Sequence, residues 1–261
     1  MFKLVRDWLI KLLVKSTEDD HCEITPNEKA TKVIHILSIL DAQIRHAYEV
    51  KAYFCRAAYQ NDVREYFDQT SAAPGYNQIT ISLYYDLIMT VVRMFDKLPN
   101  KIHAENTASL PELMLLLKDN NTVEVLKEHE LTARTLPFDQ VTAQEKIEPG
   151  FSSLHKRKVQ ESVDHMEAEI TQLIKDFKTL SGSHYLRGLR NIRNELLAHT
   201  AININDKNVT RYGDAESLLK LTSDFIIRLN AVIRRLNDNY GKHVDRCTNS
   251  ANDYWLMVIT E

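Results

Sequence analysis

The chain contains little glycine, little proline and few cysteines, and each shortage excludes some classes of fold. Only 6 Gly and 6 Pro occur among its 261 residues. Because these residues mark most tight turns, a β-rich fold of this size would need more of them. The 3 cysteines (Cys22, Cys55 and Cys247) stand far apart and outside metal-ligand spacing, which argues against a disulfide framework or a zinc site. We therefore expect a helical protein with reduced thiols.

Long hydrophobic runs and an excess of positive charge are also missing. No apolar run approaches the roughly 20 residues that a membrane-spanning helix needs. Lys and Arg number 33 against 36 Asp and Glu, for a net charge of -3. Proteins that hold nucleic acid through their overall charge are usually basic, so any such contact here must be local. The composition favours a soluble, cytoplasmic protein.

The N-terminal segment, residues 1–15, is amphipathic. Phe2, Val5 and Leu9 form an apolar stripe, but Lys and Arg side chains interrupt the segment, so it is not a secretory signal. A basic face opposite Trp and Leu could lie on a membrane surface. Such a stripe more often packs on its own domain or on a partner. A polar stretch, residues 16–26, separates this segment from the rest.

The remaining chain shows the apolar spacing of helices that bury one face. Ser109 followed by Glu112, with Pro111 between them, is typical of a helix start. Residues 136–150 carry Pro and Gly and are predicted to be the longest loop, and residues 254–259 are a short apolar run of helix or strand. The predicted helices cover residues 27–67, 76–97, 110–117, 123–133, 152–180, 184–198 and 214–240.

Long helices joined by short turns predict an all-α, up-and-down bundle. We place this bundle at residues 27–240. An amphipathic helix and polar linker, residues 1–26, would precede it, and a tail, residues 241–261, would follow it.

Most catalytic signatures are missing from the sequence, including phosphate-binding glycine loops, the serine-hydrolase elbow and the zinc-protease motif. One segment, residues 186–200, stands out. It carries Arg187, Arg190 and Arg193 at every third position and His199 where its helix should end. A histidine can transfer a proton near neutral pH, and a guanidinium can stabilise the charge on a phosphorane-like transition state. These two groups suffice for cleaving RNA without a metal.

The sequence Arg193-Asn194, four further residues and then His199 resembles the motif of the HEPN superfamily. The lead-in over residues 189–194 and the segment Val-Arg-Met-Phe-Asp at residues 92–96 are similar to the abortive-infection, AbiU-type branch. So is the helix start at Ser109. The resemblance extends over roughly residues 30–240. Its most specific part is residues 186–200, which we call the motif segment.

The resemblance implies a helical bundle that forms a homodimer with the paired motifs at the interface. It implies a metal-independent endoribonuclease without a cofactor, which leaves 2′,3′-cyclic phosphate ends. Such proteins serve as toxins or effectors in antiviral defence, some with an antitoxin partner. Arg193 would be the transition-state cation, Asn194 a polar positioning group and His199 the general acid/base.

The resemblance also covers two residues of less certain role, Arg93 and Asp96. We interpret them as a buried pair that holds the second long helix against the motif helix. Arg187 and Arg190 are the candidates for RNA binding, together with the basic residues 155–158. On a regular helix, Arg193 and His199 would lie roughly 120° and about 9 Å apart. Either the helix loosens at His199, or the site combines residues of two subunits.

Two other interpretations remain open. His199 could cap its helix through the helix dipole, and the arginines could pair with Glu167, Glu169 or Asp224 on neighbouring helices. The protein would then be a non-catalytic RNA- or nucleotide-binding module, or a scaffold that binds partners.

Overall fold

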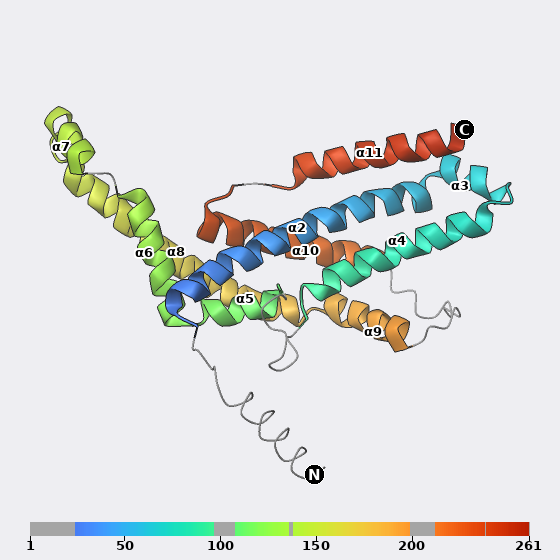
Figure 1. The fold of residues 1–261 in the computed structure, drawn as a ribbon, viewed down its shortest axis with the longest axis horizontal. Coiled ribbons are helices and arrows are strands. Elements are labelled where there is room, and N and C mark those ends of the chain that lie inside the picture. The colour runs from blue at the N-terminus through green and yellow to red at the C-terminus, as the bar shows by residue number, and fades with distance from the viewer. Residues whose placement is uncertain (1–23, 97–107, 136–137, 199–211, 238, 261) are drawn as a thin grey trace, which may run out of the picture.

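The computed structural model describes residues 24–96, 108–135, 138–198, 212–237 and 239–260 (Figure 1). All regular structure in these ranges is helical, which confirms the predicted all-α bundle. The predicted helix over residues 1–15 lies outside them. The helices are α2 (Pro26–Tyr59), α3 (Asn61–Asp68), α4 (Ala73–Arg93), α5 (Leu110–Leu117), α6 (Asn120–Arg134), α7 (Phe138–Ile147), α8 (Phe151–Ser181), α9 (His184–Ala198), α10 (Tyr212–Leu229), the π-helical turn η3 (Asn230–Arg234) and α11 (Gly241–Thr260).

Helix α2 is the centre of the bundle and packs against α4, α10 and α11. Its start is fixed by a capping box, in which Thr25 accepts from the Glu28 backbone and Glu28 accepts from the Thr25 backbone. Val33, Leu37 and Ile44 are fully buried along its inner stripe. Because apolar residues three or four positions apart share one helix face, this pattern explains why α2 lies inside.

The predicted single helix over residues 27–67 is two helices in the structure. The backbone turns extended at Gln60, with φ −96° and ψ 122°, and α3 then leads back to α4. The hydroxyl of Tyr76 donates to the carbonyl of Ala57 at 2.5 Å, which fixes this corner. Sequence periodicity continues through such a break because both helices bury apolar residues.

Helices α6, α7 and α8 form an arm that projects from one end of the bundle (Figure 1). We call these three helices the arm. The prediction of a loop over residues 136–150 is wrong, because helix α7 occupies most of this range. Its proline and glycine residues bracket the helix. Gly150 takes a left-handed conformation, with φ 90°, and Glu145 accepts hydrogen bonds from the backbone of Gly150 and Ser152, which joins α7 to the start of α8.

The last bundle helix is shorter than the predicted range 214–240. Helix α10 passes into the π-helical turn η3 and stops at Arg235, which has φ 55° and ψ 25°. The backbone amide of Leu236 closes the turn by donating to the carbonyl of Asn230 at 3.2 Å. A residue with a left-handed backbone conformation cannot continue a right-handed helix. The helix therefore ends at Arg235, and the chain continues toward α11.

Most of the predicted tail is a helix of 20 residues, α11, which lies along α2 (Figure 1). The apolar run predicted at residues 254–259 is the end of this helix. Trp255 is 2% exposed and packs with Phe67 and Tyr76 in a second apolar cluster. Whether the domain ends at residue 240 stays a prediction. In the described ranges, no helix has both the length and the apolar character needed to cross a membrane.

Candidate active site on helix α9

Residues 186–198 of the motif segment lie in helix α9, and both the apolar spacing and the start signal of this helix explain why it forms. Ser183 accepts a hydrogen bond from the backbone of Leu186 at 3.3 Å and so caps the helix. Leu186, Leu189 and Ile192 recur every third position and are buried against the core. The arginines follow each of these residues by one position, so they form a ridge along the edge of the buried face.

The ridge is tied to the end of α4 at two points. Arg193 forms an ion pair with Asp96, which lies 97 residues earlier in the chain. Arg190 donates to the backbone carbonyl of Phe95 at 2.7 Å. The Arg193 side chain is only 18% exposed, whereas that of Asp96 is 41% exposed. Two successive arginines therefore hold α9 against the turn that ends α4.

Arg193 still has hydrogen-bonding capacity at this position. Its buried Nε has no hydrogen-bond partner among the described residues. Its Nη2 lies 3.4 Å from the Asn194 side-chain oxygen, a long contact. Because leaving a buried charged donor unpaired is costly, an acceptor at this place would be bound favourably. The Arg193 guanidinium is therefore anchored by Asp96 but not saturated by the described residues.

The expected buried pair of Arg93 and Asp96 is not what the structure contains. Arg93 is exposed on the last turn of α4, because Val92 and Met94 on either side of it take the buried positions. Asp96 does join α4 to the motif helix, but its partner is Arg193. Neither this pair nor the contact of Arg190 with the Phe95 carbonyl follows from the sequence pattern.

The remaining candidates are placed only in part. Arg187 and Asn194 are exposed on α9, and His199 lies outside the described residues. The acids considered as partners of the ridge are engaged elsewhere. Glu167 pairs with Lys127, Glu169 with Arg228 and Asp224 with Lys220. Within the described ranges, no cluster of three or more His, Cys, Asp or Glu side chains could hold a metal ion.

The all-α bundle, with Arg193 and Asn194 of the motif on α9, fits a HEPN-type protein. The family model HEPN_AbiU2, described as AbiU2, matches residues 31–255, and the chain therefore belongs to this family. This confirms the resemblance seen in the sequence and extends it into α11. No curated protein and no solved structure gives a significant match.

Proposed function

We propose that this protein is a metal-independent endoribonuclease of HEPN type that cleaves single-stranded RNA. Its membership in the AbiU2 family supports the class of protein. The observation that carries the proposal is the state of Arg193. This side chain is anchored by Asp96, and its buried Nε lacks an acceptor among the described residues.

In the proposed reaction, Arg193 stabilises the charge that develops on the phosphorane. Its anchor on Asp96 holds the guanidinium in one orientation, so little reorganisation is needed when substrate arrives. Asn194, exposed beside it, positions the phosphate or the attacking hydroxyl. His199 transfers protons to and from the 2′-hydroxyl and the leaving oxygen. Arg187 and Arg190 contribute contacts to the RNA backbone.

We further propose that two copies of the chain combine to form the working site. Helix α4, which packs against α9, carries Ile81, Tyr85 and Met89 four positions apart. Ile81 is 39% exposed, and Tyr85 and Met89 are half-buried, so this stripe is not fully covered within one chain. A second copy that covers the stripe would bring two α9 helices near each other. The geometric separation expected between Arg193 and His199 on one helix favours the same arrangement.

The biological role that fits this activity is that of a toxin or defence effector in abortive infection. An antitoxin protein would then keep the activity low in the absence of infection. A protein of this kind should be difficult to express unless its site is inactivated or its antitoxin is present. Residues 1–15 would add a membrane contact only as a secondary feature.

The test is a cleavage assay on purified full-length protein with mixed single-stranded RNA in EDTA. We expect cyclic-phosphate product ends, identified by mass, and a loss of about a hundredfold or more in rate for Arg193→Ala and His199→Ala. Arg56→Ala is a matched control, because Arg56 is 13% exposed and also pairs with a carboxylate, that of Asp62. It should cleave as the wild type does. Equal activity of Arg193→Ala and wild type would refute the proposal.

A second candidate function is a non-catalytic module that binds RNA or nucleotides or serves as a scaffold. The observation that favours it is the ion pair itself, because Asp96 already compensates the charge of Arg193. Under this alternative the folded wild-type dimer would not cleave RNA in the same assay. Arg187→Gln would then weaken RNA binding measured by fluorescence anisotropy, or leave it unchanged if the protein is only a scaffold.

A further inference from the structure

A pocket lies where the arm meets the bundle, away from the residues of the proposed active site. It has a volume of about 390 Å³ and is formed by residues of α2, α6, α8 and the end of η3. A smaller pocket of about 150 Å³ lies beside it and shares Glu130, Met166 and Arg235 with it. The larger pocket is within the size range of small-molecule sites.

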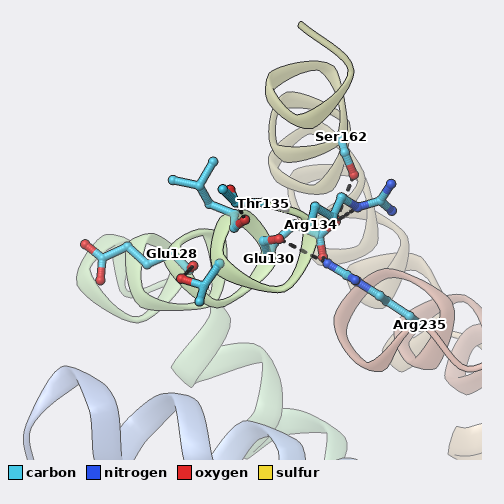
Figure 2. Close-up of polar contacts among 8 residues, drawn as sticks. Glu128, Glu130, Arg134, Thr135, Ser162 and Arg235 are labelled. Atoms are coloured by element: carbon cyan, nitrogen blue, oxygen red, sulfur yellow. Dashed lines mark hydrogen bonds and ion pairs between the residues drawn. The ribbon is translucent and has the colours of Figure 1, made fainter. Parts of the chain in front are cut away.

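Glu130, which lines both pockets, is the centre of a polar cluster (Figure 2). The carboxylate is 8% exposed and accepts hydrogen bonds from Ser162, Arg134 and Arg235, the last through two nitrogens. Arg235 also donates to the backbone carbonyl of Glu130 at 3.1 Å. This cluster holds the arm and the end of η3 in one arrangement, so the pocket between them is preformed.

The backbone at the pocket is unusual at the same place. Arg235 is the one residue other than glycine that has a positive φ in the described ranges, and it directly follows the π-helical turn. Both features are uncommon and tend to occur at functional sites. Their effect here is to turn consecutive residues, Arg234 and Arg235, toward one pocket.

The charge of the lining is positive. Glu130 is the sole carboxylate among the described residues that line the two pockets, against Arg134, Arg234 and Arg235. Glu130 is saturated by its donors, so it does not repel an anion strongly. Within the described part of the chain, Arg234 makes one hydrogen bond, from Nη1 to the Asn230 side-chain oxygen at 3.2 Å. A guanidinium has five N–H donors, and most of those on Arg234 remain for a ligand.

The rest of the larger pocket is apolar. It presents the side chains of Ile34, Leu126, Met166, Ile233 and Leu236. Leu236 is 42% exposed and Ile34 is 37% exposed, although both are large hydrophobic residues. An apolar floor beside arginines fits a molecule with a flat or aliphatic body and one acidic group.

We propose that this pocket binds a small amphipathic anion, with its apolar body against Met166 and Leu126 and its phosphate or carboxylate on Arg234. The exposed ring of His129 also lines this pocket and can donate to the same group. Since the ligand contacts the arm and η3 together, its binding strengthens their junction. This site is independent of the ribonuclease proposal, because its ligand need not be RNA.

The experiment is isothermal titration calorimetry of the full-length protein with three probes that share a naphthalene ring and differ in the group at position 1: 1-naphthyl phosphate, 1-naphthoate and 1-naphthol. We expect an anionic probe to bind one molecule per chain and at least about tenfold more tightly than the neutral 1-naphthol. Stronger binding of 1-naphthyl phosphate assigns the acidic group as a phosphate. Stronger binding of 1-naphthoate assigns it as a carboxylate.

Two variants locate the site and one serves as control. Arg234→Gln removes the proposed anion contact, and Leu236→Glu places a negative charge at an exposed lining position that the fold does not need. Both should weaken anion binding by at least about tenfold. Arg64→Gln removes an exposed arginine on α3, paired with Asp68, and should leave binding unchanged. Binding by both variants at wild-type strength, or no preference for the anions over 1-naphthol, would overturn the proposal.

Discussion

Two places in this molecule join distant segments through an arginine and a carboxylate, and they differ in how completely the groups are satisfied. At the junction of arm and bundle, the carboxylate of Glu130 is buried and surrounded by donors. At the motif helix, the arginine is the buried partner, and its Nε lacks an acceptor in the described ranges. A saturated pair is suited to holding structure together. An unsaturated pair can hold structure and still bind a further group.

The first prediction, and the largest expected effect, concerns the saturated pair. Glu130→Ala should lower the free energy of unfolding by about 3 kcal/mol, because it leaves two arginines without their buried partner. Glu128→Ala, an exposed residue half a turn away on the same helix, should change it by less than about 0.5 kcal/mol. Urea denaturation followed by circular dichroism measures both. Similar losses in the two variants would mean that the Glu130 cluster does not hold the junction.

The second prediction concerns the difference in completeness between the two places. The Glu130 cluster is complete within one chain, whereas the proposed active site needs a second copy. Ile81→Arg should produce monomers and lower RNA cleavage by about a hundredfold, since a charge on the α4 stripe opposes association. Leu115→Arg is the control, because Leu115 is 68% exposed on α5. Sedimentation velocity gives the oligomeric state. A monomeric Ile81→Arg protein that cleaves at the wild-type rate would contradict a composite site.

The third prediction tests whether Asp96 positions Arg193. Asp96→Asn should cost less than about 1 kcal/mol of stability, because the carboxylate is partly exposed. It should nevertheless lower the cleavage rate at saturating RNA about tenfold, since the guanidinium is less well oriented. Asp62→Asn disrupts a comparable pair with Arg56. It should have a similar stability cost and leave the cleavage rate unchanged. If both variants keep full activity, Asp96 has only a structural role.

The smallest expected effect is a dependence of stability on pH. Burial alone would raise the pKa of Glu130, but hydrogen bonds from Arg235, Ser162 and Arg134 outweigh it and hold the pKa below 4.5. A lowered pKa in the folded state stabilises the protein above the unfolded pKa. This stabilisation is lost as the pH falls through the folded pKa.

Thermal unfolding of wild type and Glu130→Gln checks this pH dependence. The difference in Tm should shrink between about pH 6 and about pH 3.5. A constant difference over this range would show that the charge of Glu130 makes no contribution to the junction.

The parts of the fold that depend on local pattern are predictable from the sequence. The cap at Ser109 and Glu112 is present, and α9 spans the predicted residues 184–198. Helix α11 could have been found too. Its buried residues Cys247, Ala251 and Trp255 are four positions apart, but polar residues between them obscure the pattern.

The candidate site was predictable only in part, because its contacts depend on tertiary structure. The arginine ridge follows from the spacing of α9. Its partner does not, since Asp96 is 97 positions from Arg193, and the family resemblance that singles out Asp96 does not identify Arg193 as its partner. The contact between Arg235 and Glu130 likewise joins residues that lie 105 positions apart. No pattern within a single helix encodes either contact.

The position of Trp255 has a consequence for how unfolding can be observed. The chain has 2 tryptophans, Trp8 and Trp255. In a Trp8→Phe protein, all indole emission would come from Trp255, whose Nε1 donates to the Tyr53 carbonyl of α2 at 3.2 Å. Its emission would shift to longer wavelength when α11 separates from α2, whereas far-ultraviolet dichroism follows total helix content. The two signals together would therefore reveal whether the last helix detaches before the rest of the bundle melts.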